Sequence, residues 1–244
     1  MNRRDFFAFF AAATAAPLAG VAADDYRSNF VEVSGVPDCA TVERECDAII
    51  FRLRDRYGSP RVWHKFPVVF TGGGRGYAGC TFYQKPRVNK VEICQPFENA
   101  KGGTLDHELT HAFFFYLLDD YFGLFWNEGV AQNSEYNQRD RLRSTVYRRA
   151  SNGEFVALNG LVNRSNYDGS LLIYHQGFSV VDFLIARAGS KWFYAFLDAL
   201  TNGNTGLNDA LETFYGYASL DELDEDWRRY VAGGQDRATV TPVF

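Results

Sequence analysis

The sequence has neither an excess of positive charge nor a long apolar run beyond its first residues. Its 244 residues carry 30 acidic and 25 basic side chains, a formal net charge of −5, and include no basic tail. A nucleic-acid partner is therefore not expected, because such partners bind clustered Lys and Arg. The apolar run AFFFYLL ends at Asp119 and Asp120, well short of the ~20 residues that cross a membrane. We expect no permanent membrane span.

The first 23 residues, MNRRDFFAFFAAATAAPLAGVAA, differ in kind from the rest of the chain. They combine the pair Arg3 and Arg4 with a short alanine-rich apolar stretch and a Val-Ala-Ala ending before Asp24. This pattern predicts an export signal. The segment NRRDFF resembles the twin-arginine (Tat) type, and a general secretory signal is the alternative. We therefore expect a periplasmic or secreted protein in which residues 24–244 form a single domain.

Cysteine is scarce, with four residues and no C-x-x-C spacing, so a cysteine metal site is not expected. An even number of cysteines in an exported chain favours two disulfides, and the sequence leaves three connectivities open. Cys80 and Cys94 flank TFYQKPRVNKVEI, which is typical of a hairpin in which facing positions sum to 174. That register favours a Cys80–Cys94 bridge and leaves Cys39 with Cys46. The second bond requires Cys39 to lie in the turn before a helix.

Hydrophobic periodicity divides the chain into a strand-rich part, residues 24–100, and a helical part, residues 104–232. The first part shows strands at residues 30–35 and 65–70, a helix at residues 40–58 and the hairpin at residues 80–94. From Thr104 onward the periodicity is helical, and Ser219 and Glu222 form a possible capping box before the last helix. We expect an α+β fold with a small N-terminal mixed sheet, and an active-site helix that joins the two parts.

The stretch LDHELTHAFFF, residues 105–115, carries two of the four histidines. On a helix, His107 and His111 project from one face, close enough to share a cation. Glu108 lies about 100° round the helix, where it can take a proton from a water bound to the metal. H-E-x-x-H on a helix is the metalloprotease signature for this reason. Two core histidines on a buried helix are the alternative.

A third ligand is needed, because a catalytic zinc site uses three protein ligands and an open fourth position. Glu128 follows His111 by 17 residues, far enough for a turn at Gly123 and a second helix that returns past the metal. The segment FWNEGVAQNSE around it resembles the E-G-x-A stretch that carries the glutamate ligand in gluzincins. The chain is thus similar to the superfamily of thermolysin and the alanyl-type aminopeptidases. This resemblance implies a zincin-like fold and one zinc ion on His107, His111 and Glu128.

The same resemblance assigns roles to two further residues. Glu135 lies seven positions after Glu128, on the same helix face, and matches a carboxylate that orients a ligand histidine in the aminopeptidase branch. Tyr174 in YHQGFSVVDFL matches the tyrosine of a Y-x-x-G stretch that stabilises the oxyanion. His175 is the alternative hydrogen-bond donor to the oxyanion. The alternative for both Tyr174 and His175 is a purely structural role, in which they pack at the start of a helix.

These features predict an exported zinc-dependent metallopeptidase that acts on a peptide or protein substrate. The segment G-A-M-E-N, with which aminopeptidases bind a free amino terminus, is absent, and GYAGCTFY stands in the corresponding place. We therefore expect an endopeptidase whose edge strand, near residues 78–83, pairs with the substrate backbone. The alternatives are a non-catalytic zincin-fold module that binds a peptide or cell-wall component, and a zinc hydrolase of a non-peptide bond.

The segment RDRLRSTVYRRA, residues 139–150, is locally basic. Its arginines could face an acidic substrate or a lipid head group. A solvated helix face is the expected arrangement, because charge runs of this length usually face water. The arginines are Arg139, Arg141, Arg143, Arg148 and Arg149.

Overall fold

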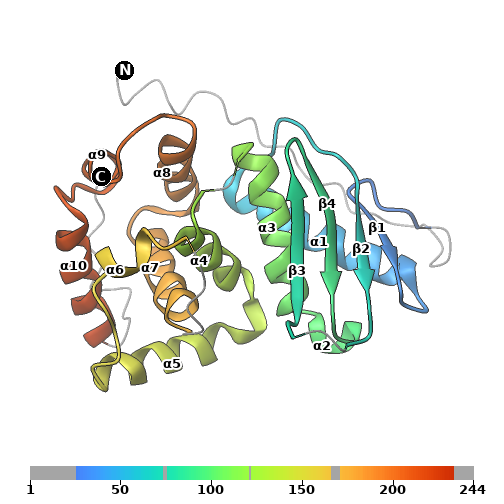
Figure 1. Ribbon diagram of the computed structural model, residues 1–244, viewed down its shortest axis with the longest axis horizontal. Coiled ribbons are helices and arrows are strands. Elements are labelled where there is room, and N and C mark those ends of the chain that lie inside the picture. Colours follow the sequence, from blue (N-terminus) through green and yellow to red (C-terminus); the bar gives the residue numbers. More distant parts are fainter. Residues whose placement is uncertain (1–25, 74–75, 121, 166–170, 234–244) are drawn as a thin grey trace.

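The computed structural model describes residues 26–73, 76–120, 122–165 and 171–233. The expected export signal, residues 1–23, lies outside these ranges. The first part of the fold contains a four-stranded sheet and one long helix (Figure 1). Its elements are β1 (Val31–Ser34), α1 (Cys39–Tyr57), β2 (Phe66–Phe70), β3 (Gly79–Gln84) and β4 (Arg87–Ile93).

Helices make up most of the rest of the described chain. Together with the small mixed sheet they confirm the α+β class expected from the sequence. The helices are α2 (Phe97–Ala100), α3 (Thr104–Leu118), α4 (Leu124–Ser134), the 3-10 turn η3 (Tyr136–Gln138), α5 (Arg139–Ser151), α6 (Asn159–Val162), α7 (Leu172–Ala188), α8 (Ser190–Thr201), α9 (Leu207–Tyr215) and α10 (Leu220–Ala232). None of those in the described ranges combines the length and apolarity that a membrane crossing requires.

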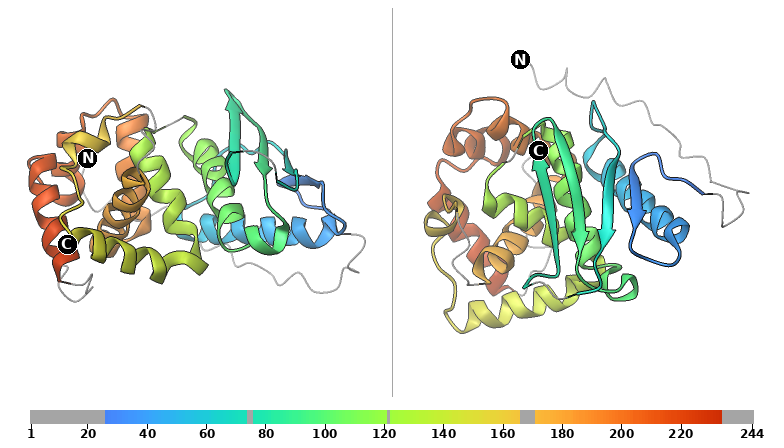
Figure 2. Two further views of the ribbon diagram at one scale, coloured as in Figure 1. Left: turned by 60° about the horizontal axis from the view of Figure 1, so that its bottom comes forward. Right: turned by 45° about the vertical axis from the view of Figure 1, so that its right-hand side comes forward.

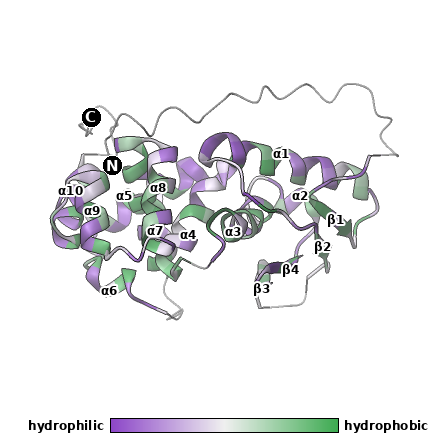
Figure 3. Cartoon of the chain, turned by 90° about the horizontal axis from the view of Figure 1, so that it is seen from above, coloured by the Kyte–Doolittle hydropathy of each residue, from purple (hydrophilic) through white to green (hydrophobic). Residues whose placement is uncertain are grey.

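The sheet has the strand order β1-β2-β4-β3, in which β3 alone runs antiparallel to its neighbour. Helices α1 and α3 cover one face of the sheet, as the view from above shows (Figure 3). Helix α3 is buried nearly all round, because it packs against the sheet on one side and against α4 on the other. The helix therefore stands between the sheet and the bundle formed by α4 to α10 (Figures 1 and 2). Strand β3 forms the edge of the sheet nearest this bundle.

The hairpin register differs from the expected one. Gln84 pairs with Arg87 across a two-residue turn, and a bulge between Phe82 and Tyr83 shifts the pairing so that Cys80 lies opposite Glu92. Paired positions beyond the bulge therefore sum to 172 rather than 174. The turn is centred between Lys85 and Pro86 rather than on residue 87, where the expected register places it, because proline favours a turn position and interrupts a strand.

The cysteines are free, and neither expected disulfide is present. Cys80 does not face Cys94, whose backbone N–H instead donates to the carbonyl of residue 78 at 2.7 Å. Cys39 is the first residue of α1 rather than part of the turn before it. Seven residues of helix span about 10 Å, which is too far for a bond between Cys39 and Cys46.

Helices α4 and α7 cross at two glycines. A Cβ built on Gly129 would lie 2.6 Å from the carbonyl oxygen of Gly177 and 2.9 Å from Cγ2 of Val181. A Cβ on Gly177 would lie 3.0 Å from the carbonyl oxygen of Phe125. Only glycine permits this contact between backbones, which explains the glycine that follows Glu128 in the E-G-x-A stretch.

Replacing Gly129 with alanine is expected to lower the free energy of unfolding by about 1–3 kcal/mol, because the two nearest atoms in the way belong to the backbone of Gly177. Each kcal/mol corresponds to a loss of roughly 2–4 °C in Tm for a domain of this size. Calorimetry measures the change. Gly160 in α6 is the matched control, since a Cβ there meets nothing within 4 Å. Equal Tm values for the two variants would contradict the close crossing.

Candidate metal centre

His107 and His111 lie on one face of α3, with ring centroids 4.7 Å apart. The carboxylate of Glu128 meets both rings: His107 Nε2 lies 3.1 Å from Oε2, and His111 Nε2 lies 3.6 Å from Oε1. One ligand atom from each residue falls within a group whose members are all within 4.8 Å of one another. All three side chains are buried. The three residues selected from the sequence form a group that could hold a metal ion.

A tight turn brings Glu128 to the two imidazoles. Helix α3 ends at Leu118, and Asp119 adopts the left-handed conformation with φ 56°. Gly123, with φ 84°, precedes the first residue of α4. Two left-handed residues reverse the chain within a few positions, as the turn expected at Gly123 requires.

The outer nitrogens of both imidazoles have partners. His107 Nδ1 lies 2.8 Å from Glu135 Oε1, and His111 Nδ1 lies 3.0 Å from Asn127 Oδ1. A proton held on each Nδ1 leaves the Nε2 lone pairs directed at the space beside Glu128, which is the arrangement of metal-ligating histidines.

The structure places these two partners differently from the sequence interpretation. Glu135 contacts His107 but lies just after the end of α4, so it does not share a helix face with Glu128 as predicted. Asn127 was not selected from the sequence. Its position directly before Glu128 was the available clue, because neighbouring helix positions can reach the two sides of one site.

Negative charge surrounds the paired rings. Burial lowers the pKa of His107, but hydrogen bonds to Glu128 and Glu135 and the charges of Glu128 and Glu108 outweigh it, so the pKa lies well above its ordinary value. The carboxylates therefore favour a positive charge at this position. A bound cation would supply that charge in place of the proton.

Glu108 is buried beside the ligand group without belonging to it. The Thr81 hydroxyl lies 2.9 Å from Glu108 Oε2 and 2.9 Å from the Glu108 carbonyl oxygen, so strand β3 fixes this side chain. Gly79 makes the approach possible, because a Cβ there would lie 2.8 Å from Glu108 Cγ. Neither Gly79 nor Thr81 was identified from the sequence, since both act through a strand distant in sequence.

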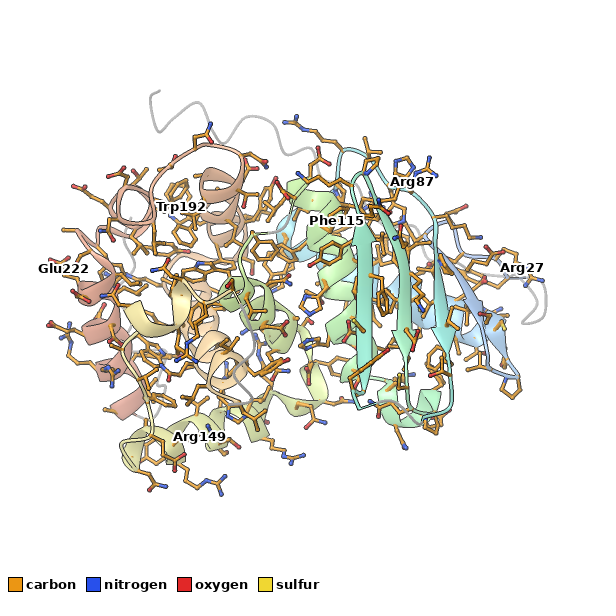
Figure 4. The ribbon with its side chains drawn as sticks, viewed as in Figure 1. Arg27, Arg87, Phe115, Arg149, Trp192 and Glu222 are labelled. Carbon is orange, nitrogen blue, oxygen red and sulfur yellow. The ribbon has the colours of Figure 1, made fainter. Side chains whose placement is uncertain are left out.

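A cleft of about 440 Å³ opens over the group. Strand β3 lines one side of it, and Tyr83 there stacks on Phe115 at 4.9 Å (Figure 4 labels Phe115). Tyr174 lines the cleft from α7, with its ring centroid 6.4 Å from that of His107. The lining residues are Gly79, Cys80, Thr81, Tyr83, His107, Glu108, His111, Leu124, Asn127, Glu128, Ser165 and Tyr174.

His175, the alternative oxyanion donor, faces away from the cleft. Burial and the charges of Arg149 and Arg148 lower its pKa to about 4. Those arginines lie at the far end of α5, where Figure 4 labels Arg149. The buried Nδ1 of His175 has no hydrogen-bond partner in the described part of the chain. Of the two candidate oxyanion donors, only Tyr174 lies beside the group formed by His107, His111 and Glu128.

Sequence comparisons do not place the chain in a family. No family model matches it, and no curated protein matches its sequence. The chemistry of the site therefore has to be argued from its own geometry.

Proposed function

We propose that the protein is a zinc-dependent metallopeptidase with a zincin-like fold and a gluzincin ligand set. The observation that carries the proposal is the meeting of His107, His111 and Glu128 in one group beside a buried glutamate, Glu108. The cleft over this group is bordered by an edge strand, which offers unpaired backbone groups to an extended peptide.

The donor set supports zinc rather than magnesium or calcium. Two imidazole nitrogens and one carboxylate are the ligands of many catalytic zinc sites, whereas the harder cations prefer oxygen ligands alone. Glu135 and Asn127, which contact the Nδ1 atoms of His107 and His111, also support zinc. They favour the tautomer with the proton on Nδ1, which leaves Nε2 free to bind the metal. The side of the group that faces the cleft is left for a water molecule and the substrate.

Bound zinc would supply Lewis acidity, lowering the pKa of a water and polarising the scissile carbonyl. Glu108 is placed to take a proton from that water and to pass it to the leaving amine. The Thr81 hydroxyl keeps the carboxylate in position. The Tyr174 hydroxyl donates to the oxygen that becomes negative as water adds to the carbonyl. Strand β3 holds the peptide backbone along the cleft.

The proposal includes the cleavage type and the location. We propose an endopeptidase rather than an aminopeptidase, because the G-A-M-E-N segment is missing and the edge strand itself reads GCTFYQ. The pattern of residues 1–23 supports export by the twin-arginine route.

The direct test measures zinc content and the cleavage of a broad peptide library by the purified protein. We expect about one zinc per chain and cleavage at internal bonds. A chelator should stop cleavage, and added zinc should restore it. Zinc binding without cleavage would instead indicate the binding module, and hydrolysis confined to esters or sugars would indicate a non-peptide hydrolase. A protein expressed with zinc that remains metal-free would contradict the assignment.

Replacing Tyr174 with phenylalanine removes one hydroxyl and keeps the ring. We expect unchanged zinc content and a fall in kcat of about a hundredfold or more, because the oxyanion loses a donor. Steady-state kinetics and metal analysis check both parts. His175→Gln is the matched control, since His175 faces Arg148 and Arg149 rather than the cleft. An unchanged kcat for Tyr174→Phe would remove Tyr174 from the mechanism.

A further inference from the structure

The basic helix α5 turns two of its arginines inward instead of toward water. Arg143 makes a bidentate pair with Asp182, with its closest contact at 2.9 Å. Arg139 Nη2 donates to Asn133 Oδ1 at 2.8 Å and lies 3.5 Å from Asp182. Arg56 from α1 reaches the same amide oxygen at 2.6 Å. The expected solvated helix face is observed for Arg141 and Arg148, which are exposed, but not for Arg139 and Arg143, which pair with a buried carboxylate.

Positive charge is in excess at this place. Two arginines, Arg139 and Arg143, share one carboxylate, that of Asp182, which is 1% exposed, and Arg56 donates to neutral oxygens of Ser190 and Asn133. Burial lowers the pKa of Arg139, and the charges of Arg56 and Arg143 lower it further against the opposing effect of Asp182. The guanidinium groups of Arg56 and Arg139 meet at one neutral amide oxygen and repel each other.

Three buried polar atoms of this cluster have no hydrogen-bond partner in the described part of the chain. They are Arg139 Nε, Asn133 Nδ2 and the hydroxyl of Tyr57. Tyr57 and Asn133 are almost fully buried. Burial raises the pKa of Tyr57, and the nearby charges of Arg56, Arg139 and Asp182 change it further. Buried donors without an acceptor are rare in native proteins, because each loses its hydrogen bonds to water without a replacement. The Arg139 Nε and Asn133 Nδ2 groups can only donate hydrogen bonds, so the partner that they lack is an acceptor.

We propose that a small monovalent anion of the halide type binds between Arg56, Arg139, Asn133 and Tyr57. A single negative charge offsets part of the arginine charge and supplies the acceptor that the unpartnered groups lack. A phosphate or sulfate would bring four oxygens, more than these few buried donors can satisfy. The site joins α1, α4 and α5, and therefore ties the sheet side of the molecule to the helical bundle.

Thermal unfolding of the zinc-saturated protein at constant ionic strength tests the proposal, with sodium gluconate replaced stepwise by sodium chloride. We expect a saturable rise in Tm with chloride. Arg139→Gln should lose this rise, because it removes the charge and the Nε donor. Arg141→Gln, which removes an exposed arginine of the same helix, should respond as the wild type does. A rise of equal size in Arg139→Gln would overturn the proposal.

Two further measurements decide the matter even if Arg139→Gln does not fold. Tyr57→Phe deletes only the hydroxyl and should raise the chloride concentration at half-effect several-fold. A bromide-soaked crystal should show an anomalous peak in contact with Arg139 and Asn133. No peak at a bromide concentration that saturates the Tm effect, or a Tm that does not distinguish chloride from gluconate, would mean that water alone fills the site.

Discussion

Glu108→Gln is expected to reduce peptide hydrolysis by a factor of roughly 10² to 10⁴ while zinc stays bound. Glutamine keeps the size of the side chain and an oxygen that can accept from the Thr81 hydroxyl, but it has no basic oxygen for the proton of water. The three ligands are untouched, because Glu108 is not one of them. Single-turnover kinetics together with metal analysis measures both quantities on the same sample.

Glu212→Gln provides the control, since Glu212 is an exposed residue of α9, far along the chain from the cleft. It should retain full activity. A Glu108→Gln protein that turns over any peptide at the wild-type rate, with contamination excluded, would end the proposed mechanism. If neither the wild type nor the variant cleaves peptides, although both bind them, the protein is a binding module.

His111→Ala should lose zinc almost completely, because two remaining ligands cannot hold a catalytic site. The loss of affinity should exceed the roughly 10–100-fold that removal of an outer partner causes. Glu135→Gln tests that smaller effect directly, since Glu135 contacts His107 without joining the ligand group. Competition with a chromophoric chelator gives the three affinities on one scale.

His64→Ala is the matched control for the loss of an imidazole, because His64 contacts Tyr116 and lies outside the ligand group. It should bind zinc as the wild type does. Circular dichroism establishes that each variant is folded before its affinity is compared. Zinc retained at wild-type affinity by His111→Ala would contradict the ligand assignment.

Local sequence features predicted most of the helices and the three residues of the group that could hold a metal ion. Helix α3 begins at Thr104 as expected, and Ser219 caps α10 by accepting from the backbone N–H of Glu222. The second half of that capping box differs, because the Glu222 side chain accepts from the N–H of residue 218 rather than of Ser219. Spacing was sufficient for His107 and His111, since both project from one helix and need no knowledge of distant contacts.

Features set by contacts between distant segments could not be predicted in the same way. The hairpin register depends on a bulge and on the position of one turn, and a shift of two in the paired sum separates Cys80 from Cys94. The support that Thr81 gives Glu108 depends on how a strand lies against a helix. Arg139 turns inward because Asp182, more than 40 residues later, is buried beneath it.

The backbone contact between Gly129 and Gly177 limits how the cleft can change its width. Helices α4 and α7 touch without side chains between them, so neither can slide or tilt independently of the other. Glu128 and Tyr174 therefore keep their spacing and travel as a pair, while His107 and His111 stay with α3 and the sheet. Any widening of the cleft would pull the carboxylate away from the imidazoles. A cation bound by Glu128, His107 and His111 would hold the α4–α7 pair against α3 and the sheet. Release of the cation and opening of the cleft would then occur together.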